Sequence, residues 1–166
     1  MGAGAHGTIP YSARLPWSRS PPRHRCSSQF LISATNNLVA KFPMRLINTS
    51  TGQLEEFIGS QIPKYAILSH TWEDDEVSFK DLNEGIYKHK KGFIKIAKTC
   101  ELAAASGLKY AWVDTCSIDK SSSAELTEAI NSMYQWYQRA EVCYAFLSDL
   151  PENADLGEQL PRCRWL

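Results

Sequence analysis

One segment organises the predicted fold: Tyr110-Ala-Trp-Val-Asp-Thr-Cys-Ser-Ile-Asp-Lys120. Its first four residues are apolar and β-favouring, which predicts a short buried strand. The polar residues that follow predict a turn. Ser122 and Glu125 then have the S-x-x-E spacing of a capping box, which predicts the start of a helix. A strand, a polar turn and a capped helix form half of a βαβ unit, and ligands of open parallel sheets bind beside such turns.

Further strands are predicted on both sides of this segment. Continuous apolar runs at residues 65–70 and 142–147 are typical of buried strands. Two shorter strands, 44–48 and 54–57, flank Thr49-Ser-Thr-Gly52 and predict a hairpin. Apolar strands that alternate with helices favour a parallel sheet covered on both faces. We therefore predict an α/β fold of three layers with a mainly parallel sheet.

Two helices are predicted, at about residues 92–106 and 123–139, because apolar residues recur there at helical spacing. In the first helix, Lys95, Lys98 and Glu101 are expected to face away from the sheet. The residues assigned to the sheet-facing stripes are Phe93, Ile96, Ala97, Cys100, Ala103 and Ala104 in the first helix, and Leu126, Ala129, Ile130, Met133, Trp136 and Tyr137 in the second.

The two ends of the chain differ from its centre in composition. Residues 1–43 are rich in Gly, Ser, Pro and Arg, and we predict a disordered extension there and a domain at 44–166. An organelle transit peptide is an alternative for the extension, although its prolines oppose the amphipathic helix that such a peptide needs. Residues 151–166 are polar and irregular. One more strand and helix would complete the sheet, so we expect the domain to be incomplete at its C-terminal end.

Charge and cysteine content narrow the class of protein. Residues 1–43 hold five basic and no acidic residues, so 44–166 hold 13 basic and 18 acidic ones. An acidic domain opposes nucleic-acid binding. No apolar run approaches the length of a membrane span. The five cysteines form no C-x-x-C pair, which gives no support for a metal site. We expect a reduced, cytoplasmic protein without a bound metal.

Polar residues follow each of the three long strands, and parallel strands would bring them to one edge of the sheet. We expect a ligand pocket there. An alternative is that these side chains only satisfy the backbone of tight turns. The candidate pocket residues are Ser69, His70 and Trp72 after the first strand, Asp114, Thr115, Cys116 and Asp119 after the second, and Ser148 and Asp149 after the third. No catalytic residue is assigned among them.

Three other groups of residues are candidate sites. Cys116 and His70 could act as nucleophile and base, but a buried small side chain is the simpler reading of Cys116. The carboxylates Glu73-Asp-Asp-Glu76, with Asp81, could hold a divalent cation or form a solvated loop. Lys88-His-Lys-Lys91 is a small basic patch that is expected to be solvated.

Several motifs resemble the fungal heterokaryon-incompatibility (HET) domain. They include Tyr65-Ala-Ile-Leu-Ser-His-Thr-Trp72, Gly107-Leu-Lys-Tyr-Ala-Trp-Val-Asp-Thr-Cys116 and Ala140-Glu-Val-Cys-Tyr-Ala-Phe-Leu-Ser-Asp149, and the resemblance runs in order over residues 44–166. The chain departs from the family pattern in two ways. Ser117 stands where a second cysteine is common, and the chain stops before the R-G-W-T-L-Q-E-L motif that follows an Arg-Trp like Arg164-Trp165.

The resemblance implies a fold and a role. The HET domain resembles the TIR fold, a flavodoxin-like parallel sheet, and acts in non-self recognition that leads to programmed cell death. The implied partners are a second copy or another incompatibility protein. The implied alternative is an enzyme that cleaves NAD as its substrate, with no bound cofactor assured. The glutamate for that reaction would lie in the motif after Arg164-Trp165, so we expect this chain not to cleave NAD. A third reading is a fragment without a function of its own.

Overall fold

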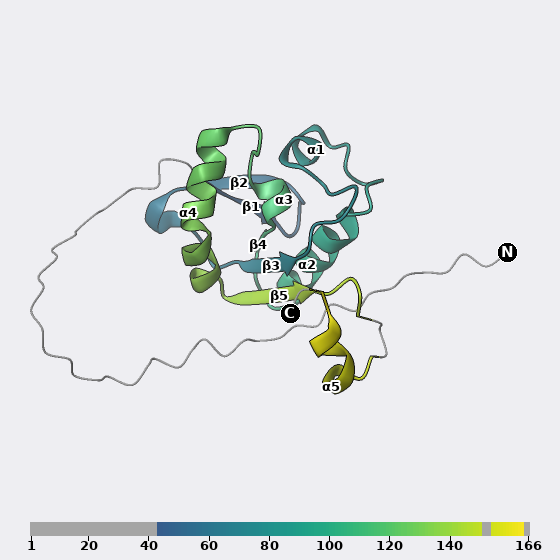
Figure 1. Ribbon diagram of the computed structural model, residues 1–166. Helices are drawn as coiled ribbons and strands as arrows, with labels where there is room; N and C mark the ends of the chain where they lie inside the picture. The colour runs from purple at the N-terminus through teal and green to yellow at the C-terminus, as the bar shows by residue number, and fades with distance from the viewer. Residues whose placement is uncertain (1–42, 151–153, 165–166) are drawn as a thin grey trace, which may run out of the picture.

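The computed structural model describes residues 43–150 and 154–164, and these form a five-stranded sheet between helices (Figure 1). The predicted extension therefore lies outside the described residues, apart from Pro43. The sheet has the order β2-β1-β4-β3-β5. Its strands are β1 Met44–Asn48, β2 Leu54–Phe57, β3 Ala66–His70, β4 Tyr110–Trp112 and β5 Val142–Phe146.

The three central strands are parallel, as the sequence predicted. β3 pairs in parallel with β4 on one side and with β5 on the other. The predicted hairpin also forms, because β1 and β2 pair antiparallel. β1 then joins β4 in antiparallel fashion, with Ile47 opposite Ala111. The sheet is therefore mixed, with a parallel core and an antiparallel hairpin at one edge.

Both long helices form where they were predicted. The helices are α1 Phe79–Glu84, α2 Phe93–Ala105, α3 Asp114–Ser117, α4 Ser123–Arg139 and α5 Leu156–Gln159, with 3-10 turns η1 Gly59–Gln61 and η2 Leu160–Arg162. Gly107 ends the α2 segment with a φ of 76°, a left-handed conformation that glycine adopts without strain. None of these helices is long and apolar enough to cross a bilayer.

The start of α4 differs from the expected capping box. Ser122 caps the helix, since its side chain accepts a hydrogen bond from the Glu125 N–H. The Glu125 carboxylate, however, does not return to the cap. It accepts from the Asp119 N–H and from Arg45 on β1 instead. A complete capping box occurs at α1, where Ser78 and Asp81 bond each other's backbone N–H.

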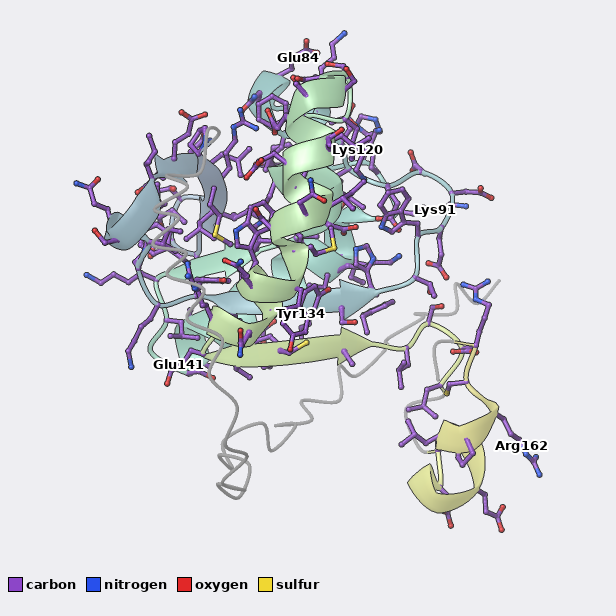
Figure 2. The ribbon with its side chains drawn as sticks, turned by 60° about the vertical axis from the view of Figure 1, so that its left-hand side comes forward. Glu84, Lys91, Lys120, Tyr134, Glu141 and Arg162 are labelled. Carbon is purple, nitrogen blue, oxygen red and sulfur yellow. The ribbon has the colours of Figure 1, made fainter. Side chains whose placement is uncertain are left out.

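Two apolar clusters lie on opposite faces of the sheet and make the predicted three layers. On one face, strand residues such as Leu68 and Tyr144 pack with Ile96 and Ala103 of α2. On the other, Trp112 packs edge-on against Trp136 and Tyr137 of α4. Figure 2 shows α4 lying across this face, with Tyr134 labelled on it.

The structure corrects parts of the predicted helix faces. Lys95 is buried rather than facing away, and only 3% of it is exposed. Ile130 was assigned to the sheet-facing stripe, yet it is 61% exposed. Ala97 and Ala104 are exposed as well. The physical reason for the first error is an acidic loop that folds over Lys95, and a helical period cannot show such a partner.

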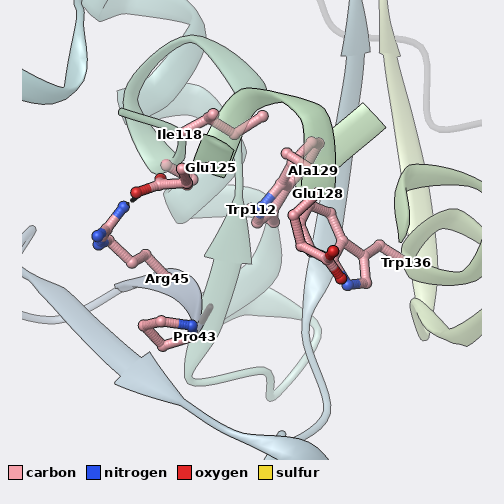
Figure 3. Close-up of a pocket in the computed structure, with 9 residues that line it drawn as sticks. Pro43, Arg45, Trp112, Ile118, Glu125, Glu128, Ala129 and Trp136 are labelled. Carbon is pink, nitrogen blue, oxygen red and sulfur yellow. Dashed lines mark hydrogen bonds and ion pairs between the residues drawn. The ribbon is translucent and has the colours of Figure 1, made fainter. Parts of the chain in front are cut away.

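A largely buried ion pair joins the hairpin to α4. Arg45 contacts Glu125 through Nη1 (Figure 3). Its Nε lies 2.8 Å from Glu56. The guanidinium also stacks over the Phe79 ring at 4.4 Å. The adjoining cavity has a volume of about 10 Å³, which is room for a water molecule and not for a ligand. This pair is therefore a structural link between β1, α1 and α4.

We predict that Glu125→Leu destabilises the domain by about 3 kcal/mol, because it leaves a buried guanidinium with Glu56 alone. The double variant Arg45→Met/Glu125→Leu should regain part of that loss, since no charge then stays buried. Urea unfolding measures both free energies. A double variant no more stable than Glu125→Leu would contradict this account of the pair.

Candidate functional site

The ends of β3 and β4 are joined by one carboxylate. His70 is the last residue of β3, and Asp114 follows β4 after one intervening residue, Val113. The Nε2 atom of His70 lies 2.9 Å from Oδ1 of Asp114. The other oxygen, Oδ2, accepts a hydrogen bond of 2.7 Å from the indole Nε1–H of Trp72. Burial would raise the pKa of Asp114, but the bonds from His70 and Trp72 and the nearby charge of Lys120 outweigh it and hold the pKa below its usual value.

Trp72 is exposed and yet held in place. Of its surface 58% is open to solvent. The Nζ atom of Lys120 lies 3.5 Å from the centroid of the indole ring, in a cation–π contact. Partial burial lowers the pKa of Lys120, while the charge of Asp114 opposes that shift. Asp114 and Lys120 thus fix the edge and one face of the ring.

Lys95 holds the loop that carries Trp72. Its ammonium group contacts the carboxylate of Glu76, lies 3.2 Å from Oε2 of Glu73 and donates to the Thr71 carbonyl oxygen at 3.1 Å. Sequence reasoning missed this residue. The run of acids at 73–76 was the available signal, because acids that pack against a core need a cation.

Gly92, just before α2, allows the same loop to pack closely. A Cβ atom at this position would lie 2.6 Å from Oε2 of Glu76 and 2.8 Å from its Cα. Any other residue would therefore push the loop away from Lys95.

The residues that follow β5 also contact this loop, through Glu73 and Thr71. The Ser148 hydroxyl bonds Glu73 and, together with Lys95 and Arg164, lowers the pKa of Glu73 against the effect of burial. Asp149 accepts a 2.8 Å bond from the Arg164 N–H. Arg164 then donates from Nη2 to Oγ1 of Thr71 at 3.1 Å. All three strand ends therefore contribute to one rim.

A cleft of about 540 Å³ opens at this rim, which is a volume suited to a small molecule. Three of the predicted pocket residues line it, namely His70, Trp72 and Asp114. The other lining residues are Thr71, Met133, Tyr137 and Arg164.

Tyr137 closes the sheet side of the cleft. Its hydroxyl donates to the Leu68 carbonyl oxygen at 3.2 Å, and burial raises its pKa to about 12. The hydroxyl also bonds Ser69, so that predicted residue contacts a lining residue of the cleft without lining it.

The remaining predicted residues lie outside the cleft. Thr115 and Cys116 are buried beneath it in α3, and Oγ1 of Thr115 has no hydrogen-bond partner in the described part of the chain. The Asp119 carboxylate accepts hydrogen bonds from the N–H and from the hydroxyl of Ser121. Ser148 and Asp149 support the rim through Glu73 and Arg164 and do not line the cleft.

The proposed Cys116–His70 pair does not form. Cys116 is fully buried and its Sγ points at the Val113 carbonyl oxygen, 3.7 Å away. Burial raises the pKa of this thiol, which opposes the thiolate that a nucleophile needs. His70 Nε2 is engaged by Asp114, and its buried Nδ1 lacks a hydrogen-bond partner among the described residues, with Glu76 Oε1 3.9 Å away.

Lysines form ion pairs with Glu73 and Glu76 of the acidic loop and with Asp81. Lys95 pairs with Glu73 and Glu76, and Lys90 pairs with Asp81 at 2.6 Å. Burial would raise the pKa of Asp81, but bonds from Lys90 and Ser78 lower it to about 2. No group of three or more potential ligands for a metal ion occurs within residues 43–150 and 154–164. The cation-site hypothesis for these carboxylates thus finds no support in the described residues, and Lys90 of the basic patch is a structural partner.

The fold and rim define an α/β protein with a cleft at the carboxyl ends of parallel strands. Residues 65–163 match the family model of the Heterokaryon incompatibility protein (HET), and the chain belongs to this family. It is 48% identical over 107 residues to Vegetative incompatibility protein HET-E-1 of Podospora anserina. That match covers 63% of this chain and 8% of that protein, so the chain spans a small part of its relative. No solved structure matches the chain.

We predict that Asp114→Asn makes the domain less sensitive to acid. The pKa of Asp114 is below its ordinary 3.8 in the folded state, so its ionised form stabilises the fold above about pH 4. That contribution is lost as the pH falls through the lowered pKa, and an asparagine has none to lose. Urea unfolding from near-neutral pH downward measures the difference. Asp74→Asn, at an exposed aspartate, is the control, and equal slopes for wild type and Asp114→Asn would contradict the prediction.

Proposed function

We propose that this chain is a HET module of fungal non-self recognition, which promotes programmed cell death by TIR-like self-association in the cytoplasm. Its membership of the HET family supports the role in incompatibility. The similarity to a vegetative incompatibility protein agrees with it. The partner would be a second copy of the chain or another incompatibility protein.

One observation carries the association step: an exposed apolar strip on α4. Ile130 and Tyr134 are 61% and 77% exposed. With Met133 and Tyr137 they follow the i, i+3, i+4, i+7 spacing of a single helical stripe. Met133 and Tyr137 line the cleft, so the strip extends the wall of the cleft outward. Exposed aromatic and aliphatic residues in one stripe are typical of a protein contact surface.

The neighbouring edge of the sheet is also open to a partner. β5 pairs with β3 on one side, and no other strand of the described chain pairs with it. Its sequence, Val142–Phe146, holds no charged residue or proline that would discourage strand addition. Both features favour contact with another protein on this side of the molecule.

We predict that the wild-type chain associates with rising concentration and that Ile130→Lys/Tyr134→Lys stays monomeric, because two charges on the strip oppose burial. Sedimentation velocity measures the association. Expression in a filamentous fungus, scored by viable counts, should show cell death with the wild type and less death with the variant.

The matched control is Ile86→Lys/Ile94→Lys, two isoleucines of about 50% exposure away from α4. It should associate and kill like the wild type. A wild-type chain that is monomeric at every concentration and harmless in cells would contradict the proposal and favour the reading as a fragment without its own function.

A second candidate function is cleavage of NAD, which the cleft at the strand ends favours as a nucleotide-sized site. The carboxylates beside the cleft are already engaged. Asp114 is held by His70 and Trp72, and Glu73 by Ser148 and Lys95. Neither is free to stabilise an oxocarbenium-like centre.

We therefore predict that the purified 166-residue chain releases no nicotinamide from NAD above the rate in buffer. Chromatography of the reaction mixture measures the release. Clear turnover that Asp114→Asn abolishes would contradict this prediction and make NAD cleavage the leading function.

A further inference from the structure

The cleft holds an indole ring whose position is fixed before any ligand arrives. The Trp72 N–H is bonded to Asp114, its ring is covered on one side by Lys120, and its loop is anchored by Lys95. A tryptophan that is 58% exposed would bury more apolar surface if it were free to turn inward. Here the polar bonds keep the ring at the wall of the cleft, where it can stack on a flat ligand.

The cleft is also lined by an apolar and an aromatic side chain from α4. Met133 and Tyr137 come from α4, and the Tyr137 hydroxyl is bonded to the Leu68 carbonyl oxygen. A ligand ring in the cleft would therefore have an aromatic and a thioether side chain available besides Trp72, and both favour aromatic surfaces. The volume of about 540 Å³ fits a ring with a substituent and exceeds what a simple ion needs.

The third lining element is a cation. Arg164 is exposed, and Nη2 is the guanidinium nitrogen that contacts Thr71 and, at 3.8 Å, Glu73. Within the described part of the chain its other guanidinium donors have no partner. Free donors of an arginine suit a phosphate or carboxylate. The acids nearby already have partners, because Asp114 is hydrogen-bonded to His70 and Trp72 and Glu73 pairs with Lys95.

We propose that the cleft binds a nucleotide, with its base stacked on Trp72 and its phosphate bonded to Arg164. This inference builds on the second candidate function by naming the residues and the ligand chemistry, but it requires no cleavage. It also explains why the loop after β3 is so heavily restrained: a stacking surface that is already in place does not lose conformational freedom on binding.

The test uses AMP, adenosine and ribose 5-phosphate as probes for base plus phosphate, base alone and phosphate alone. Isothermal titration with the whole 166-residue chain measures each affinity. AMP should bind about tenfold more tightly than adenosine and about tenfold more tightly than ribose 5-phosphate. The reason is that base stacking and the bond to the phosphate each contribute about tenfold in affinity. Absence of AMP binding at millimolar concentration overturns the inference.

Variants separate the two contacts. Trp72→Ala should reduce AMP affinity about tenfold, to that of ribose 5-phosphate, while Trp72→Phe keeps an aromatic face and loses less. Arg164→Gln should reduce AMP affinity to that of adenosine. Ile94→Ala and Arg162→Gln, at exposed residues outside the cleft, should bind as the wild type does. Circular dichroism confirms that each variant is folded.

The inference is also overturned by wild-type affinity in Trp72→Ala or in folded Arg164→Gln. Ribose 5-phosphate that binds as well as AMP overturns it too, because that result would indicate an anion site only. Failure of the second candidate function is distinguishable from these. AMP binding without nicotinamide release supports the inference and removes that function. Nicotinamide release that is undiminished in Trp72→Ala supports the function and overturns the inference.

Discussion

The Asp114 carboxylate is the constraint on which the rim of this domain depends. Its two oxygens take hydrogen bonds from His70 at the end of β3 and from Trp72 in the loop beyond. One side chain after β4 therefore fixes the end of the neighbouring strand and the orientation of an exposed ring. The bonds are charge-assisted and lie in a partly buried site, where such bonds are stronger than in water. The bond from Trp72 thus ties its side chain to the end of the sheet.

A second layer of charges supports this carboxylate. Lys95 reaches from α2 to the backbone of Thr71 and to the acids of the loop, and Gly92 lets that loop approach closely. A solvated loop was one expectation for the acidic run at 73–76. The ion pairs with Lys95 instead make this run part of the scaffold. Such buried charge clusters add little net stability but define one arrangement of their groups. A fixed arrangement is what a binding cleft requires, and it favours ligand binding over chemistry at these carboxylates.

The sequence was enough to predict the parallel core, because apolar runs and helical periods are local signals. It could not show that β1 joins β4 antiparallel, since strand pairing depends on contacts between distant residues. The convergence of His70 and Asp114 followed from the parallel order. The burial of Lys95 and the exposure of Ile130 did not, because each depends on what packs beside the helix. For residues 77–81 the sequence left either an extended piece or a single turn open, and the helix α1 forms there; Ser78 and Asp81 carry a capping-box signal that favours it.

The most direct test of the central role of Asp114 is the indole N–H of Trp72, observed by ¹H–¹⁵N NMR and assigned with Trp72→Phe. The hydrogen bond to the carboxylate predicts that the chemical shift of this proton lies downfield. It also predicts slower exchange with water than an exposed indole without a hydrogen bond would show. Both properties should be lost in Asp114→Ala, while the other indole protons of the folded chain keep their shifts. An unchanged Trp72 signal in Asp114→Ala would contradict the account.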